Sequence, residues 1–154
     1  MWLNAVSDAI LAINMKGKYL TIAILLLSLL ASCHRQQRHD TEVFHYAAER
    51  LGLVIPDEPH SFVFVTKEGC TGCKPLALSY AKTNLSDTIT FVTTPLLMSL
   101  YDVPQRECIV VDSSALIERL NWSLHGIIEV YTTGRKVKEM CDYDINNVTS
   151  RFYN

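Results

Sequence analysis

Three features that would assign the chain to a common functional class are missing from its sequence. Its 14 lysines and arginines are outnumbered by 16 aspartates and glutamates and form no basic stripe, which argues against nucleic acid as a partner. No apolar run reaches the roughly 20 residues that a membrane-spanning helix needs. No internal repeat or low-complexity tract is visible. The chain is therefore expected to form a globular domain, and its N-terminus needs a separate explanation.

The N-terminal segment carries the pattern of a secretory signal peptide. In residues 15–32, two lysines precede an apolar stretch, which leads through small residues to Cys33. The sequence LASC, which ends at Cys33, resembles the lipobox of bacterial lipoproteins. This resemblance implies that Cys33 is lipidated and becomes the new N-terminus; ordinary cleavage near Ser32 is the alternative. Residues 1–14 precede a signal that has its own methionine, so we expect a mis-called upstream start there, with a short upstream helix as the alternative.

The signal predicts the location of the mature chain. Residues 33–39 are polar and are expected to tether a domain over residues 40–154, a length that suits a single compact core. A lipoprotein of this kind would be anchored in the bacterial cell envelope and would face the periplasm. No glutathione pool keeps thiols reduced outside the cytoplasm. A close pair of cysteines is therefore expected to cycle through a disulfide.

Hydrophobic periodicity predicts an alternation of helices and strands. Helices are expected over residues 40–52, 71–83, 95–101 and 112–120 and from residue 144, and strands over residues 61–66, 88–94 and 107–111 and in a hairpin over residues 126–140. The helix over 112–120 is predicted because capping residues precede apolar residues at helical spacing. Alternating strands and helices imply parallel pairing, to which the hairpin adds an antiparallel edge. The predicted fold class is α/β, on a mixed sheet.

The sequence KEGCTGCKP places Cys70 and Cys73 between a predicted strand and a predicted helix. Unpaired amides and the macrodipole at a helix N-terminus favour an anion, so the pKa of the first thiol is expected to be lowered there. Gly72 allows a tight bend, and Lys74 adds positive charge. Cys70 could then attack a substrate disulfide, and Cys73, one helical turn further on, could resolve the intermediate.

A zinc site and an inert structural disulfide are the competing interpretations of this pair. Structural zinc normally needs two further ligands, usually from a second close pair. The remaining cysteines, Cys108 and Cys141, are far apart in the sequence. The redox couple is therefore the favoured interpretation. Cys108 is expected to be a small buried residue, and a Cys108–Cys141 disulfide is a minor alternative.

The stretch FVFVTKEGCTGCKP resembles the thioredoxin superfamily, and most of all the membrane-tethered, thioredoxin-like lipoproteins of bacterial envelopes. The order of elements through CIVVDSSALIERLNWSLHGIIEVYTTGRKVKEM is similar to the rest of that fold. The resemblance implies a three-layer α/β/α sandwich on a mixed sheet, with a C-terminal hairpin and helix. It also implies a thiol–disulfide oxidoreductase with Cys70 as nucleophile and Cys73 as resolving thiol. No organic cofactor is implied; the partners would be protein thiols or disulfides and a redox protein.

Two departures from the family pattern are visible. The Trp-Cys-Gly-Pro-Cys motif of thioredoxin is absent. The cis-proline that thioredoxins place opposite the cysteines is also missing, because counting back from Gly134 puts Leu124, His125 and Gly126 at that position. In an alternative register, Pro104 would be the cis-proline.

His125 at this position would face the two thiols, and this permits a different function. Two thiolates and an imidazole form a suitable ligand set for copper(I), and Sco-type copper chaperones, which are thioredoxin-like, use two cysteines and a distant histidine. The alternative function is therefore a copper-binding protein that uses Cys70, Cys73 and His125. His125 could instead tune the pKa of Cys70 or be an ordinary loop residue. A degenerate module whose role is binding is the third possibility.

Overall fold

The structure is a computed structural model that describes residues 37–83 and 86–152. The predicted upstream segment 1–14, the signal peptide 15–32 and the lipidation residue Cys33 lie outside the described residues. The fold below is that of the compact unit His39–Asn154, whose first helix begins at residue 37. None of the described helices is long and apolar enough to cross a membrane.

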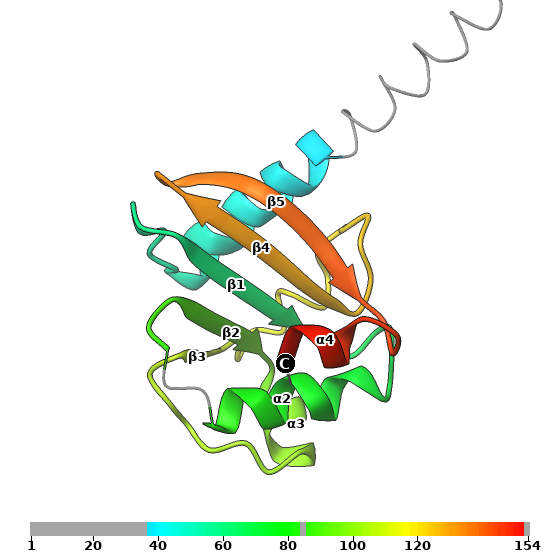
Figure 1. Cartoon of the computed structure of the whole chain (residues 1–154). Helices are drawn as coiled ribbons and strands as arrows, with labels where there is room; N and C mark the ends of the chain where they lie inside the picture. Colours follow the sequence, from blue (N-terminus) through cyan, green and yellow to red (C-terminus); the bar gives the residue numbers. More distant parts are fainter. Residues whose placement is uncertain (1–36, 84–85, 153–154) are drawn as a thin grey trace, which may run out of the picture. The chain divides into compact units, whose positions relative to one another are not determined.

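A helix over residues 37–51 is followed by an alternation of strands and helices. The elements are β1 (His60–Val65), α2 (Cys73–Thr83), β2 (Ile89–Thr93), α3 (Pro95–Leu100), β3 (Ile109–Val111), β4 (Ile127–Thr133), β5 (Lys136–Tyr143) and α4 (Val148–Phe152). The strands form one sheet in the order β3-β2-β1-β4-β5 (Figure 1). Strands β1, β2 and β3 run parallel, whereas β4 is antiparallel to both β1 and β5. The predicted α/β class and the mixed sheet are confirmed.

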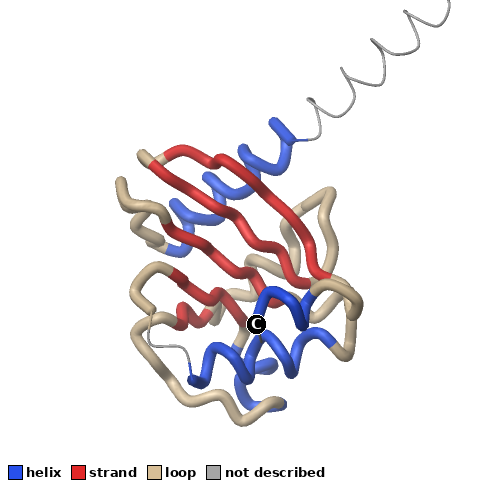
Figure 2. Tube along the Cα trace, in the orientation of Figure 1, coloured by secondary structure: helices blue, strands red, loops and turns tan. Residues whose placement is uncertain are grey.

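Strand β1 is the centre of the sheet and is buried on both faces. Val63 and Val65 belong to the core that also contains buried residues of α2 and α4. Phe62 and Phe64 point to the other face, where both lie within 6.1 Å of the Phe44 ring, measured between centroids. Helices therefore pack on both faces of the sheet, with helix 37–51 behind it and α2 and α4 in front (Figure 2). Burying one phenylalanine contributes roughly 2 kcal/mol, so the apolar run in β1 fixes this strand in the core.

The helix predicted over residues 112–120 is not formed, and this prediction was wrong. The Asp112 carboxylate accepts hydrogen bonds from the Ser114 N–H at 3.0 Å, the Ser114 hydroxyl at 2.7 Å and the Ile117 N–H at 2.8 Å. Ala115 has a φ of 51°, which no α-helix contains. An aspartate that binds backbone groups ahead of it competes with helix formation. The segment is therefore a loop whose Ile117 and Trp122 still fill the core under helix 37–51.

Predicted boundaries are confirmed at two turns and shifted at one end of a helix. The hairpin turn consists of Gly134 and Arg135, with φ of 57° and 59°, the conformation of a two-residue turn that matches strand twist. Gly52, with φ of 67°, ends the first helix as predicted. That helix already includes residues 37–39, so it begins earlier than the predicted residue 40. Asp40 binds Ser123 through its carboxylate, with one oxygen 2.8 Å from the Ser123 nitrogen.

Candidate functional site

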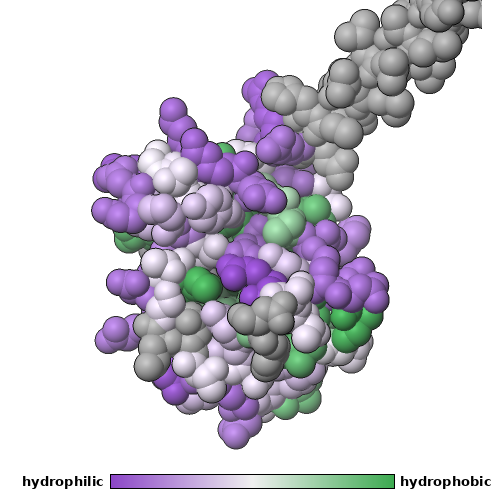
Figure 3. Space-filling model, in the orientation of Figure 1, coloured by the Kyte–Doolittle hydropathy of each residue, from purple (hydrophilic) through white to green (hydrophobic). Residues whose placement is uncertain are grey.

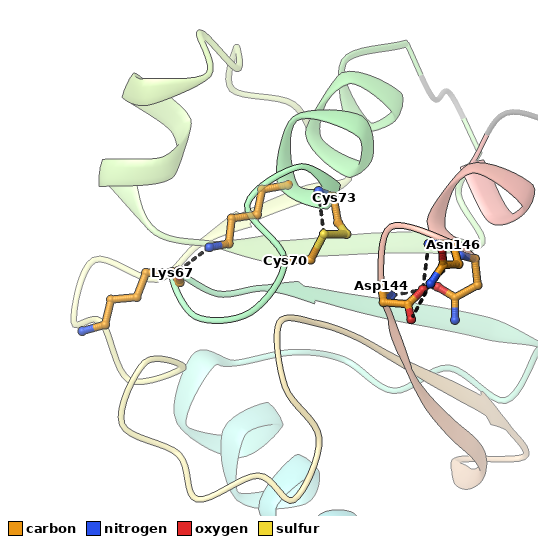
Figure 4. Close-up of a disulfide and its surroundings, with 7 residues drawn as sticks. Lys67, Cys70, Cys73, Asp144 and Asn146 are labelled. Carbon is orange, nitrogen blue, oxygen red and sulfur yellow. Dashed lines mark hydrogen bonds between the residues drawn. A yellow bond between two sulfur atoms is a disulfide. The ribbon is translucent and has the colours of Figure 1, made fainter.

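Cys70 and Cys73 form a disulfide at the carboxyl end of β1, the central strand. Their Cα atoms are 5.3 Å apart. Helix α2 begins at Cys73, two residues later than predicted, so Cys70 lies in the loop that leads into the helix (Figure 4). Pro75 falls in the first turn of α2, where its missing N–H breaks no intrahelical hydrogen bond.

The two cysteines differ in their exposure to solvent. Cys73 is fully buried at 0% exposure, whereas Cys70 is partly exposed. The backbone N–H of Cys73 donates to the Cys70 sulfur at a distance of 3.2 Å. After reduction, such a donor favours the thiolate of Cys70 over its thiol. The more exposed cysteine is therefore also the one whose sulfur accepts a backbone hydrogen bond.

The loop that carries Cys70 is held at Lys67 from both sides. The Lys67 N–H donates to both oxygens of Glu118, at 2.8 and 3.0 Å. The Lys67 carbonyl accepts a hydrogen bond from the ammonium group of Lys74. Burial raises the pKa of Glu118, although the Lys67 N–H works against this effect. Lys74, predicted only as a nearby positive charge, is 5% exposed and acts as an internal support of the loop.

A second loop packs directly against the cysteine loop. A Cβ atom added to Gly69, whose φ is 77°, would overlap the Cα of Gly126 and come within 2.8 Å of its nitrogen. Thr66 reinforces this contact because its hydroxyl donates to the Gly126 carbonyl at 3.0 Å. Residues 124–126 therefore lie opposite the cysteines, where counting back from the hairpin turn had placed them.

Pro104 does not occupy this position. It lies in the segment between α3 and β3, and β3 pairs in parallel with β2 instead of forming a hairpin strand. The alternative register, with Pro104 as the cis-proline, was wrong. Among the peptide bonds that the structure describes, none is cis.

Cys70 and His125 line the same cavity, which has a volume of about 270 Å³. His125 is exposed, and its backbone N–H donates to the Asp142 carboxylate over 3.5 Å. The remaining walls come from the end of β5 and from the turn before α4: Gly69, Asp142, Tyr143, Asp144 and Asn147. The cavity thus brings His125 to Cys70, which is disulfide-bonded to Cys73, and adds an acidic wall formed by Asp142 and Asp144.

The acidic wall was not predicted from the sequence, in which residue 144 only began a predicted helix and Asp142 had no role. Hydrogen bonds from the Asn146 and Asn147 backbones, at 2.8 and 3.2 Å, lower the pKa of Asp144. Pairing of the two hairpin strands is the signal that could have located these residues. The hairpin pairs Ile127 with Tyr143 and Ile128 with Asp142, which brings the end of β5 back to the loop at His125.

Cys108 and Cys141 are not joined to each other by a disulfide. They lie at β3 and β5, the opposite edges of the sheet, so a bridge between them would require a different strand order. Both are partly buried. Burial raises the pKa of the Cys141 thiol, which donates to the Tyr143 hydroxyl oxygen at 3.5 Å.

The copper alternative remains a prediction. His125 shares a cavity with Cys70, which keeps the histidine near the pair. Within residues 37–83 and 86–152, however, no group of three or more His, Cys, Asp or Glu residues is arranged to hold a metal ion.

Comparisons with known proteins identify no relative: no family model, curated protein or solved structure matches the chain. Support for a function therefore comes from the cysteine pair and its surroundings.

Proposed function

We propose that this protein is a thiol–disulfide oxidoreductase with a thioredoxin-like fold that works through Cys70 and Cys73. One observation carries the proposal. The two cysteines form a disulfide at the start of a helix, in which Cys70 is partly exposed and lines a cavity whereas Cys73 is fully buried. Such asymmetry suits a pair in which one thiol attacks and the second resolves.

The arrangement of the sheet supports the thioredoxin-like part of this proposal. Strand β1 leads into the cysteine pair and has a parallel strand on one side and an antiparallel hairpin on the other. Helices cover both faces of the sheet, as a three-layer sandwich requires. The loop of residues 112–126 occupies the place where the family resemblance implies a third helix. The fold would thus be thioredoxin-like with one helix replaced.

The exchange reaction has two steps, which begin from the reduced dithiol. The Cys70 thiolate attacks a substrate disulfide, forms a mixed disulfide and displaces one substrate thiolate, which takes up a proton. Cys73 then loses its proton and attacks the Cys70 sulfur, which releases the second substrate thiolate. Two electrons pass from the protein dithiol to the substrate, and the Cys70–Cys73 disulfide is restored. A partner dithiol returns the protein to its reduced state; in the reverse direction the disulfide oxidises a substrate dithiol.

The sequence motifs complete the proposal with a location. Lipid on Cys33 would anchor the domain in the bacterial envelope, facing the periplasm, and electrons would come from or pass to another redox protein there. The lipid anchor has its own test. Mass spectrometry of the protein from a membrane fraction should show a lipidated N-terminal cysteine, and a Cys33→Ser variant should lose both the lipid and membrane retention.

The central experiment measures whether the pair cycles. The domain is equilibrated with thiol–disulfide buffers of graded potential, and the ratio of dithiol to disulfide is read by mass after alkylation. We expect a two-electron transition, together with reduction of insulin when a dithiol is supplied. The absence of a measurable transition together with failure to reduce insulin would overturn the proposal. A Cys70→Ser, Cys73→Ser double variant is the matched control.

The copper-binding alternative is tested separately, because His125 lines the cavity at Cys70. Copper(I) is titrated into the reduced domain, and the affinity is compared with that of His125→Ala. A weaker affinity in the variant would support a site made of Cys70, Cys73 and His125. Equal affinities would remove His125 from any such site.

A further inference from the structure

Carboxylates line the cavity at Cys70 and a neighbouring cavity. Asp142 and Asp144 line the cavity that contains Cys70. A neighbouring cavity of about 150 Å³ shares His125 with it and is lined by Glu68 and Glu118. Neither cavity is lined by a lysine or an arginine of the described residues. A substrate that reaches Cys70 therefore meets negative charge on both sides of His125.

Lys67 and Lys74 act electrostatically on Glu118 and oppose the rise in its pKa that burial causes. Neither lysine is among the groups that shift the pKa of Asp144. Lys74 is buried, and its ammonium group binds the Lys67 carbonyl inside the loop. The side chain of Lys67 extends away from the disulfide (Figure 4). Asp144 keeps its charge because two backbone N–H groups bind its carboxylate. Backbone N–H groups therefore stabilise the negative charge of Asp144, which lines the cavity.

The reacting surface also has a small apolar part. Ile145 is 55% exposed, and its side chain lies 3.1 Å from the position of a Cβ added to Gly72, between the two cysteines. On the face shown in Figure 3, hydrophilic side chains predominate and hydrophobic ones form small separate patches. Recognition of a substrate here would therefore rely on charge and on one short apolar contact.

We propose that this cavity selects peptide disulfides in which the reacting cysteine is flanked by lysine or arginine. The proposal rests on the exchange activity proposed above and specifies its substrate class. A cationic side chain next to the substrate sulfur would lie near Asp142 and Asp144, and the attraction would favour the encounter that precedes attack by Cys70. Opposite charges a few ångströms apart at a wet surface change a rate by about fivefold, and salt reduces this effect.

The test uses three disulfide-linked peptide dimers with blocked termini, Lys-Cys-Lys, Gln-Cys-Gln and Glu-Cys-Glu. The pre-reduced domain reacts with each peptide in one turnover: one protein dithiol and one peptide disulfide give one protein disulfide and two peptide thiols. The rate is read by mass after acid quenching. Each rate is divided by that of dithiothreitol with the same peptide, because flanking charge also alters the intrinsic reactivity of a disulfide. The variants are Asp142→Asn, Asp144→Asn and their double variant.

We expect the normalised rate for the lysine peptide to exceed that for the glutamate peptide by about tenfold at low salt. The preference should shrink several-fold in the double variant and also at high salt. Asp57→Asn is the control, because it removes the same charge from an exposed ion pair with Arg135 near the hairpin turn; its preference should equal that of wild type. Thermal melts check that all variants fold.

Two outcomes would overturn the inference, and a third addresses the activity itself. A normalised preference near one in wild type, or a preference that the double variant retains, removes the acidic wall from recognition. A domain that does not react even with the neutral glutamine peptide would instead contradict the proposed exchange activity. Failure of the substrate class and failure of the function are thus distinguished in one set of measurements.

Discussion

Cys70 and Cys73 carry the same thiol chemistry, and the difference between them comes from exposure. Cys73 is buried in the core beneath α2, whereas Cys70 lines a cavity. A thiol reacts with a soluble reagent only when that reagent can reach it as a thiolate. The single-cysteine variants should therefore differ strongly in reactivity.

The first prediction concerns these variants. In Cys73→Ser, iodoacetamide should alkylate Cys70 at least about tenfold faster than it alkylates Cys73 in Cys70→Ser, because burial protects the second thiol. Mass spectrometry over time at neutral pH gives both rates. The Cys73→Ser variant should also retain mixed disulfides with substrates. Equal alkylation rates would contradict the assignment of Cys70 as the attacking thiol.

The second prediction concerns Gly69. Its φ of 77° and its contact with Gly126 leave no space for a side chain. Gly69→Ala should therefore destabilise the fold by about 3 kcal/mol or more and should displace the loop at His125, since backbone strain and overlap add together. Chemical denaturation gives the free energy of unfolding, and exchange activity shows whether the redox site is disturbed.

A matched control is available at the hairpin turn. Gly134 also has a positive φ, but a Cβ there would have no neighbour within 4 Å. Gly134→Ala should cost only about 1 kcal/mol and should leave activity unchanged. Equal losses in the two variants would show that the close approach of Gly69 and Gly126 is unimportant.

Among the structural elements, the loop of residues 112–126 is the one that replaces a predicted helix. Asp112 is buried, and its carboxylate satisfies the N–H groups of Ser114 and Ile117. Its neighbour in the loop, Glu118, holds the Lys67 N–H near the cysteines. This loop therefore connects the core under helix 37–51 to the redox site.

The third prediction follows from this connection. Asp112→Ala should destabilise the protein by about 2–3 kcal/mol, because two backbone donors lose their partner. Asp57→Ala, which removes a carboxylate from an exposed ion pair, should cost less than about 1 kcal/mol. Denaturant unfolding measures both variants. A small loss in Asp112→Ala would mean that the loop does not depend on this aspartate.

On the scale of the whole molecule, a partly buried ion pair links the C-terminal helix α4 to the sheet. Arg151 on α4 donates two hydrogen bonds to Glu129 on β4, at 2.7 and 2.5 Å. The Tyr143 hydroxyl donates a third to the same carboxylate at 2.5 Å. Burial by itself raises the pKa of Glu129, but the hydrogen bonds from Arg151, Ser61 and Tyr143 outweigh it and lower the pKa below its ordinary value of 4.5.

The fourth prediction is a pH dependence with a definite sign. Because the pKa of Glu129 is lower in the folded state, its contribution to stability is complete above pH 4.5 and is lost as the pH falls through and below that value. Glu129→Gln should reduce this acid sensitivity. Urea midpoints between pH 7 and pH 3 test it; a variant with the same pH profile as wild type would contradict it.

The fifth prediction removes the other partner. Arg151→Ala leaves Glu129 buried without its cation and should cost about 3 kcal/mol. Arg135→Ala breaks the exposed pair with Asp57 and should cost less than about 1 kcal/mol. If both variants melt alike, the pair does not fasten α4.

Much of the fold was predictable from local signals. The apolar run of β1, the capping glycine at position 52 and the turn at Gly134 are specified by neighbouring residues, so their positions were predicted correctly or within a few residues. The helix over 112–120 was wrong because Asp112 binds the backbone groups ahead of it, and sequence spacing does not reveal whether a carboxylate caps a helix or closes a loop. Asp142 and Asp144 were missed as site residues for a different reason. They lie more than seventy residues from Cys70, and only strand pairing brings them to it.

The sequence by itself determined the α/β pattern and the cysteine pair between a strand and a helix, and it favoured residues 124–126 as the loop opposite that pair. These features depend on periodicity, turn residues and spacing, which act over short stretches of chain. The tertiary structure decided which cysteine is partly exposed, how Glu118 and Lys74 hold the loop at Lys67, and that carboxylates line both cavities at His125. The reason is physical: burial and electrostatic environment are properties of the atoms that meet in space, and strand pairing, not sequence proximity, determines which atoms meet.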